Sequence, residues 1–348
     1  MKPRLLQLAA PKILGAFFLA LGFSSCEEQK QAEWPGPTLE EPAAPSSAAE
    51  TKAAAEDGSM NAEKASKPGP GDKASGSISF VAYNLENWLT MDRYVDRQQV
   101  SDASKPEKEK QAIISLLSRS KPDILGVCEI GSEADLKDLQ SRLAEAGLDL
   151  PHSYHTGGAD PVRRLAMLSR FPIASTQAHN ELSYQLEGRT FEMGRGILDA
   201  TVETPAGPVR FIGTHLKSKR EIPEADQEMM RRAEAHLVRE QIESILEQSP
   251  EMPLVVYGDM NDTRQATTLR TLQGPRNGPT SMKMAFLKDS VGTSWTHFWS
   301  YQDVYSRFDY ILFNEPMTDR FVWENCHVID DPEAAIGSDH RPLYVEFR

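Results

Sequence analysis

The chain has 348 residues, of which 39% are apolar, 26% charged and 8% aromatic, and this balance excludes a fibrous or wholly disordered protein. Its three cysteines exclude a disulfide-stapled scaffold, and its formal charge of −13 disfavours a protein that grips duplex DNA through a basic surface. Residues 1–76 and residues 77–348 differ sharply in composition, and only the longer part is patterned like a folded domain.

Residues 1–26 have the parts of a secretory signal. A basic start precedes the apolar run from Ile13 to Phe23, which is shorter than the roughly 20 residues that span a bilayer. The tetrapeptide ending at Cys26 resembles the lipobox of bacterial lipoproteins, although Phe23 stands where leucine is usual. We therefore expect an extracytoplasmic protein attached to the membrane by a lipid on Cys26, with plain secretion or an uncleaved anchor as alternatives.

Residues 27–76 consist largely of Ala, Pro, Glu, Lys, Ser and Gly, with Trp34 as the only aromatic residue. Such a segment cannot bury enough apolar surface to offset the entropy lost on ordering. We predict a disordered linker here, followed by one catalytic domain at residues 77–348.

Strands and helices are interspersed in that domain. Short apolar or alternating runs predict strands, and a 3.6-residue period predicts helices. In chain order these are a strand at 78–84, a helix at 107–119, a strand at 124–129, a helix at 132–146, strands at 165–169, 196–202 and 209–214, a helix at 224–248, and strands at 254–258, 308–313 and 343–347. Residues 269–296, rich in Pro, Asn and Gly, are predicted to form a loop. This order favours an α/β fold in which helices cover a mixed sheet.

The helix at 224–248 carries apolar residues at helical spacing. These are Met229, Ala233, Leu237, Ile242 and Leu246. We predict that this stripe faces the core.

Acids, amides and histidines fall at the ends of the predicted strands, where they would face a shared cleft. They are Asn84, Glu86, Glu129, His215, Asp259, Asn261, Asp309, Asp339 and His340. Carboxylate and amide oxygens suit Mg²⁺ or Mn²⁺ rather than zinc, and a histidine beside an aspartate can take a proton from water. The set predicts hydrolysis of a phosphate ester, with Arg195 and Lys217 as candidates to hold phosphate oxygens.

Six motifs in order, namely YNLEN, the glutamate after DILGV, GTHLKSK, GDMND, FDYIL and SDHRPL, resemble the endonuclease/exonuclease/phosphatase superfamily. The resemblance covers about residues 78–347. It implies a four-layer α/β sandwich, in which two packed mixed β-sheets are flanked by helices and the active site lies at one edge. It also implies a metal-dependent hydrolase that uses Mg²⁺ or Mn²⁺, with Ca²⁺ in a structural role as a further option.

The resemblance implies roles for the metal-binding residues. Glu129 is the principal metal ligand, and Asn84 contacts the metal or the phosphate. Asp339 and Glu86 are further groups around the metal.

The resemblance also implies roles in proton transfer. Asp309 and His340 form an Asp–His pair in which His340 is the general base, and His215 is the second histidine, acting as a general acid or stabilising the phosphate. Asp259 and Asn261 orient the nucleophile and the phosphate, and that aspartate is the alternative base.

Two pairings are open at the level of sequence. Asp160 is the candidate acidic partner of His215, although arginines lie close to it in the chain. Cys128 and Cys326 form either a bridge or two buried free thiols, and we favour the free thiols.

The charge of residues 77–348 bears on the substrate, because 30 Lys and Arg stand against 41 Asp and Glu, a balance of −11. A tight binder of duplex DNA usually has a basic surface, so a nuclease here would need a locally basic cleft. We favour a monomeric extracytoplasmic nuclease acting on nucleic acid. A phosphatase or phospholipase such as a sphingomyelinase, and an inactive surface binding module, are the alternatives.

Overall fold

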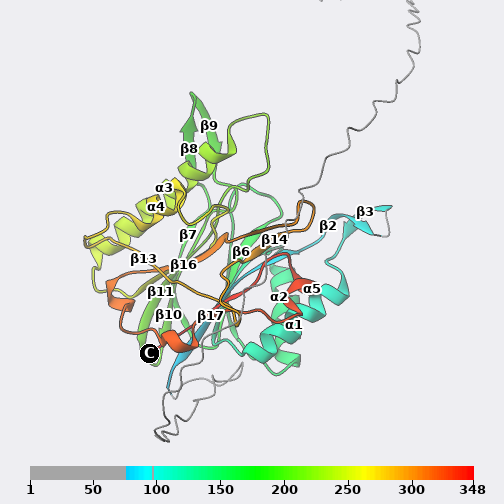
Figure 1. The fold of residues 1–348 in the computed structure, drawn as a ribbon, viewed down its shortest axis with the longest axis horizontal. Coiled ribbons are helices and arrows are strands. Elements are labelled where there is room, and N and C mark those ends of the chain that lie inside the picture. Colours follow the sequence, from blue (N-terminus) through cyan, green and yellow to red (C-terminus); the bar gives the residue numbers. More distant parts are fainter. Residues whose placement is uncertain (1–75, 96–97) are drawn as a thin grey trace, which may run out of the picture. The chain divides into compact units, whose positions relative to one another are not determined.

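The computed structural model describes residues 76–95 and 98–348 (Figure 1). The expected signal peptide, the lipobox and the linker up to residue 75 lie outside these residues. Within the described ranges, no helix combines the length and the apolar character needed to cross a membrane.

Two six-stranded mixed sheets form the centre of the domain. The first sheet has the order β17 (His327–Val328), β18 (Leu343–Phe347), β1 (Ile78–Trp88), β4 (Ile124–Ile130), β6 (Arg164–Ser169), β5 (His152–Thr156). The second has the order β13 (Lys283–Met284), β16 (Asp309–Phe313), β12 (Leu254–Asp259), β11 (Gly207–His215), β10 (Ile197–Thr204), β7 (Ile173–His179). β1 pairs with β4 in parallel, and so does β11 with β12. The carboxyl ends of these strands therefore meet at one edge of each sheet.

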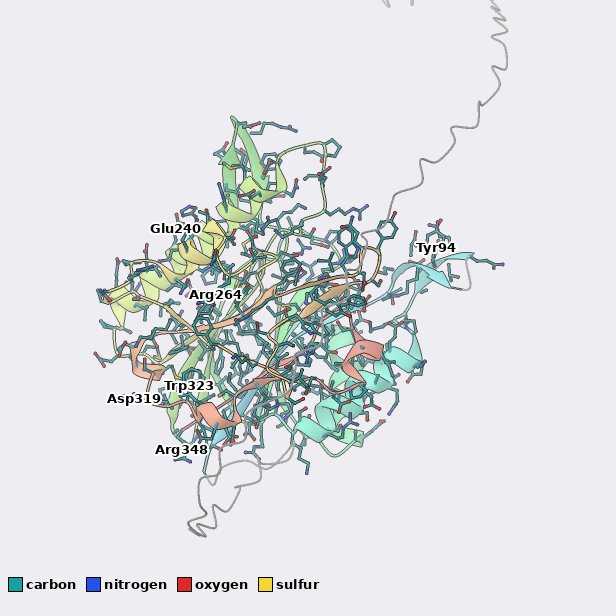
Figure 2. The ribbon with its side chains drawn as sticks, in the orientation of Figure 1. Tyr94, Glu240, Arg264, Asp319, Trp323 and Arg348 are labelled. Atoms are coloured by element: carbon teal, nitrogen blue, oxygen red, sulfur yellow. The ribbon has the colours of Figure 1, made fainter. Side chains whose placement is uncertain are left out.

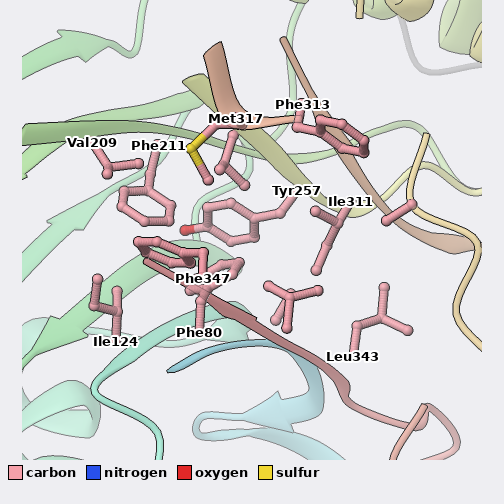
Figure 3. Close-up of a cluster of buried hydrophobic side chains, with 14 of the residues drawn as sticks. Phe80, Ile124, Val209, Phe211, Tyr257, Ile311, Phe313, Met317, Leu343 and Phe347 are labelled. Carbon is pink, nitrogen blue, oxygen red and sulfur yellow. The ribbon is translucent and has the colours of Figure 1, made fainter. Parts of the chain in front are cut away.

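The two sheets pack face to face through a fully buried apolar layer (Figure 3). Phe80 of the first sheet packs on Phe211 and Tyr257 of the second, with ring centroids 5.0 and 4.9 Å apart. Gly126 makes room for the Tyr257 ring, because a Cβ at this position would lie 2.2 Å from it. The close approach of the sheets fixes the relative positions of the strand ends.

Helices cover the outer face of each sheet, on opposite sides in Figure 1. The first sheet is covered by α1 (Glu107–Ser120), α2 (Glu133–Glu145) and α5 (Ala334–Gly337) over one apolar cluster. The second is covered by α3 (Gln227–Gln248) and α4 (Thr267–Gln273) over another. The predicted four-layer α/β sandwich is confirmed.

The core-facing stripe predicted for α3 is wrong in its N-terminal half. The helix starts at Gln227, because Asp226 caps it by accepting a hydrogen bond from the Met229 backbone, and Met229 itself is 47% exposed. The buried face there carries Arg231 and Glu234. These charges are tolerated in the buried face because each of them has polar partners.

Other elements carry too little apolar patterning to be predicted. The segment predicted as a loop, residues 269–296, contains β13 and most of α4. The edge strands β5 and β7 are largely polar. Three hairpins have strands of three to six residues, too short for a clear periodic signal. They are formed by β2 (Met91–Val95) with β3 (Gln98–Ala103), β8 (Ser183–Leu186) with β9 (Arg189–Glu192), and β14 (His297–Trp299) with β15 (Val304–Ser306). Cys128 and Cys326 are free thiols, as predicted.

Candidate active site

The predicted site residues meet where strands of both sheets end. His215, Asp259 and Asp309 are aligned across three neighbouring strands, because His215 pairs in register with Asp259 and Asp259 with Asp309. Gly258 allows this alignment for two reasons. Its φ of +134° is accessible to glycine but rarely to other residues, and a Cβ there would lie 1.8 Å from the Thr214 carbonyl oxygen. The first sheet contributes Asn84 and Glu129. With His340, just before β18, these residues form what we call the catalytic cluster: Asn84, Glu129, His215, Asp259, Asp309 and His340.

Asn84 joins the two sheets. Its Nδ2 donates to Asp259 Oδ2 at 3.2 Å and lies 3.4 Å from Glu129 Oε1, also as a donor. Asn84 is only 2% exposed, so these contacts form in a buried setting. The Asn84 amide thus contacts one carboxylate from each sheet and brings the two carboxylates together.

His340 and Asp309 form the predicted pair. His340 Nδ1 donates to Asp309 Oδ2 at 2.7 Å, and the other ring nitrogen, Nε2, lies 3.7 Å from Asp259 Oδ2. Burial by itself would lower the pKa of His340, but the charges of Asp309 and Asp259 raise it well above its usual value. Asp309 thus holds Nδ1, and Nε2 is the ring nitrogen that faces the cluster.

His215 lies on the other side of Asp259, with Nε2 3.5 Å from Asp259 Oδ2 and 3.8 Å from Glu129 Oε1. Burial, together with the charge of Arg195, lowers its pKa well below the usual value, so the ring is neutral. Its Nδ1 is buried with no hydrogen-bond partner in residues 76–95 and 98–348.

The expected pairing of Asp160 with His215 is wrong. The Asp160 carboxylate instead lies 3.7 Å from Arg163 Nη1 and 3.9 Å from Arg195 Nε. Arg163 also approaches Glu129, with 3.9 Å between Nε and Oε2. Asp160 therefore pairs with the arginines, and the contacts of His215 are with Asp259 and Glu129 of the catalytic cluster.

Carboxylates crowd this edge of the fold. Burial raises the pKa of Asp259 to about 7, with the charge of His340 opposing and that of Asp309 adding to the rise. Burial and the neighbouring Asp339 raise the pKa of Glu86 to about 7 as well. Carboxylate oxygens that repel one another are suited to bind a hard divalent cation, because the cation would relieve the repulsion.

Three site residues have a left-handed backbone conformation that residues other than glycine rarely adopt. The φ angles are 47° at Glu86, 60° at Glu129 and 49° at Asn261. At Asn261 the turn is held by its backbone N–H, which donates to Asp259 Oδ1 at 2.8 Å. Such local strain concentrates at functional sites, where surrounding structure holds a side chain in a required direction.

Asp339 and Glu86 are exposed members of the site, with 40 and 41% of their side chains accessible. The Asp339 backbone N–H donates to Glu86 Oε2 at 3.0 Å, and Asp339 Oδ1 lies 3.8 Å from His340 Nε2. His297 lies 3.6 Å from Asp339 Oδ2, and the ligand atoms of His297, Asp339 and His340 are close enough to hold an ion together. Sequence patterning did not single out His297, because only a β-bridge to His340 brings it here.

The two predicted phosphate-binding cations differ in placement. Arg195 has a buried Nε without a hydrogen-bond partner among the described residues, and its side chain is 12% exposed. The Lys217 ammonium donates to the carbonyl oxygens of Ser218 and Arg220 at 3.3 and 3.2 Å. Arg195 is therefore the cation available to the site, whereas Lys217 stabilises its own loop.

Glu234 of α3 positions the loops that carry these groups. Its Oε2 accepts from the Lys217 backbone N–H at 2.6 Å, and its Oε1 accepts from that of Gly194 at 3.5 Å. Burial raises its pKa, and the charge of Arg195 opposes this. The carboxylate thus ties together the segments that present His215 and Arg195.

Comparison with known proteins gives one family. The chain matches the model of the Endonuclease/Exonuclease/phosphatase family over residues 97–340. A search of curated proteins gave no match.

Several solved structures share the fold. An endonuclease/exonuclease/phosphatase from Bacteroides vulgatus has 18% identity and a TM-score of 0.55, covering 78% of this chain and 98% of its own. A beta toxin mutant from Staphylococcus aureus with bound magnesium ions has 14% identity and a TM-score of 0.55, covering 78% and 100%. The human Nocturnin catalytic domain with bound sulfate has 18% identity and a TM-score of 0.54, covering 78% and 94%. At these identities the likeness concerns the fold.

Proposed function

The chain belongs to the endonuclease/exonuclease/phosphatase family, and on that basis we propose that it is a divalent-metal-dependent hydrolase of phosphodiester bonds, acting as an extracytoplasmic nuclease. The observation that carries the proposal is the convergence of Asn84, Glu129, Asp259 and His340 at one sheet edge, within hydrogen-bonding or ion-pair distance of one another. These residues lie up to 256 positions apart in the chain, so only a shared site explains their meeting.

The metal ligands would be Glu129, Asn84 and Asp339. Glu86 supports Asp339 by accepting a hydrogen bond from the Asp339 backbone N–H. The oxygen atoms of the ligands suit Mg²⁺ or Mn²⁺. A beta toxin of the same fold holds magnesium ions, which supports the choice of metal. When bound, the cation would supply positive charge to the phosphoryl oxygens and the leaving group.

Proton transfer falls to the histidines and Asp259. Asp309 fixes the ring of His340 so that Nε2 faces the cluster, and it stabilises the charged ring once Nε2 has taken a proton from the attacking water. Asp339, one of the carboxylates that raise the pKa of His340, would lose part of that influence if it held a cation. Asp259, beside both histidines, orients the water. The neutral ring of His215 and the guanidinium of Arg195 would hold the phosphate.

The proposal for the location rests on residues 1–26 alone. A secretory signal that ends in a lipobox-like tetrapeptide at Cys26 would place the enzyme outside the cytoplasm on a lipid anchor. Radiolabelled palmitate incorporation into the full chain, lost in Cys26→Ala, would support this anchor.

Hydrolysis of a bis-aryl phosphodiester by the full chain tests the chemistry. We expect turnover with Mg²⁺ or Mn²⁺, loss of turnover with a chelator, and recovery when the metal is added back. Chelator-resistant turnover would contradict the metal assignment. A parallel screen of plasmid DNA, RNA, sphingomyelin and inositol phosphates tests the nuclease assignment, which preferential hydrolysis of the lipid would overturn.

A further inference from the structure

A groove of about 380 Å³ opens beside the catalytic cluster. Its principal lining residues are Thr263, Arg264, Phe286, Lys288, Tyr305 and Arg307. This volume lies within the range of small-ligand sites and suits one nucleotide unit.

The walls of the groove continue the catalytic strands. Thr263 follows Asn261 by two residues, and Arg307 precedes Asp309 by two residues. The two segments are tied together at their base, where the Met260 backbone N–H donates to the Phe308 carbonyl at 2.8 Å. The groove therefore adjoins the strand ends that carry Asp259 and Asp309, and the charge of Asp309 acts on Arg307.

The groove is locally basic in a chain that is acidic overall. Arg264, Lys288 and Arg307 line it, and within residues 76–95 and 98–348 none of these three cations forms an ion pair with a carboxylate. Arg307 donates from Nη2 to the Ala285 carbonyl at 2.8 Å, which fixes its guanidinium. Burial lowers the pKa of Arg307, and the nearby charge of Arg264 adds to this. Mutually repelling cations are stabilised by an anion.

Two exposed aromatic rings accompany these charges. Phe286 is 57% exposed and lies 4.2 Å under the Arg264 guanidinium. Tyr305 is 55% exposed, yet its ring is held in place by Phe298, stacked at 4.4 Å, and by Trp295, edge-on at 4.8 Å. Tyr305 is thus held in place and Phe286 is in contact with Arg264, and a planar group would stack on the exposed part of each ring.

We propose that this groove binds a nucleotide of a single-stranded nucleic acid whose neighbouring phosphate lies at the catalytic cluster. The inference rests on the proposed function and specifies its substrate. Arg264, Lys288 and Arg307 take the backbone phosphates, while Phe286 and Tyr305 stack with an unpaired base. A duplex fits less well, because its bases are already stacked and unavailable to the rings.

Binding to a fluorescent oligonucleotide tests the groove without turnover, in the inactive His340→Ala background of the full chain. We expect Phe286→Ala and Arg264→Gln each to weaken binding roughly tenfold. Arg264→Gln should also reduce the slope of log affinity against log salt by about 0.7, the contribution of one phosphate contact on a single strand.

The matched controls lie outside the groove. Tyr94→Ala removes an exposed aromatic ring of the β2–β3 hairpin (Figure 2), and Arg276→Gln removes an exposed cation of the loop after α4. Both should leave affinity and salt slope unchanged. A duplex of the same sequence should bind more weakly than the single strand in every background.

Hydrolysis in the otherwise wild-type chain separates this inference from the proposed function. Phe286→Ala and Arg264→Gln should raise the KM for the oligonucleotide while leaving kcat for a bis-aryl phosphodiester, which depends on the catalytic cluster, unchanged. An unchanged oligonucleotide KM beside normal small-diester turnover would overturn the groove alone, whereas loss of small-diester turnover in the parent chain would overturn the proposed function. Weakened binding to anionic phospholipid vesicles with unchanged oligonucleotide binding would also overturn the groove and assign it to a membrane.

Discussion

The catalytic cluster and the groove lie on adjoining segments of the chain, yet they are built from different kinds of side chain. The cluster gathers buried acids and histidines, such as Asp259 and Asp309 at 2 and 4% exposure. The groove gathers arginines and aromatic rings, such as Arg264 and Phe286, on an exposed surface. Buried groups with shifted pKa values can move protons and hold a cation, whereas exposed cations and rings can only bind.

This difference bears on the proposal that a protein with an acidic overall charge acts on nucleic acid. A formal charge of −13 disfavours affinity for nucleic acid over the whole surface, but part of the acid sits in the cluster, where a divalent cation would offset it. Damage to the cluster should therefore abolish turnover, and damage to the groove should affect recognition only. The predictions that follow go from the largest expected effect to the smallest.

Replacement of the proposed base should have the largest effect. His340→Ala removes the ring that donates to Asp309 and should reduce kcat on a bis-aryl phosphodiester by about 10³-fold, within the range for loss of a general base. Circular dichroism should show a folded protein. His236→Ala, at an exposed position of α3, is the control and should retain full activity. Comparable activity in both variants would remove His340 from the mechanism.

Replacement of the main metal ligand should come next. Glu129→Gln should weaken Mg²⁺ binding by about 100-fold in calorimetric titration, the upper end of the cost seen when a metal site loses a supporting group. Glu133→Gln, four residues on and exposed in the first turn of α2, should bind as the parent does. Equal affinity in the two variants would place the ion elsewhere.

A smaller effect is expected from the residue that positions two site loops. Glu234→Gln puts an amide where a carboxylate accepts two backbone N–H groups, so kcat should fall about tenfold through misplacement of His215 and Arg195. Glu240→Gln, exposed on the same helix (Figure 2), should have no effect. If Glu234→Gln lowers the unfolding free energy but leaves kcat of the folded enzyme intact, the residue is purely structural.

The smallest effect on activity is expected from an ion pair outside both regions. Asp199 is 2% exposed and accepts from Arg210 Nη2 at 2.6 Å. Burial would raise its pKa, but the hydrogen bonds of Arg210 and His179 lower it below 3.8. Because the folded pKa is depressed, the pair stabilises the fold above the unfolded pKa, and this stability is lost as the pH falls through the folded value.

Asp199→Asn should therefore lower the unfolding free energy by about 2 kcal/mol at pH 7, with unchanged kcat. The difference from the parent should shrink as the pH approaches 3 in urea titrations. Asp319→Asn, at an exposed position (Figure 2), should match the parent at every pH. A constant difference across the pH range would show that Asp199 acts without its charge.

Local patterning predicted the central strands well, because a strand buried on both faces must be apolar along its whole length. β18 was predicted with its observed bounds, Leu343–Phe347, and β12 to within one residue. The edge strand β7 was missed, since most of its side chains are exposed and carry no apolar signal. The β14–β15 hairpin was missed because each of its strands has only three residues, too few for an alternating pattern, and with it were missed the groove residues Tyr305 and Ser306.

Helix α3 shows a second limit of local patterning. An apolar stripe was expected at Met229 and Ala233, but the buried positions there are Met230, Arg231, Glu234 and Ala235. Arg231 is stabilised by Asp262, whose Oδ2 lies 3.3 Å from its Nε. Charge is excluded from a core only when it lacks a partner, and these partners lie far away in the chain.

Apolar periodicity, a local property, predicted an α/β fold with helices over a mixed sheet and the polar groups at the strand ends, and the resemblance carried by the six motifs implied the four-layer sandwich. Only the tertiary structure decided which groups touch: Asn84 between Glu129 and Asp259, His340 on Asp309, Asp160 on arginines instead of His215, and His297 beside Asp339. These contacts depend on strand register and on the packing of one sheet against the other. Both arise from the summed burial of side chains across the whole domain, which no single segment encodes.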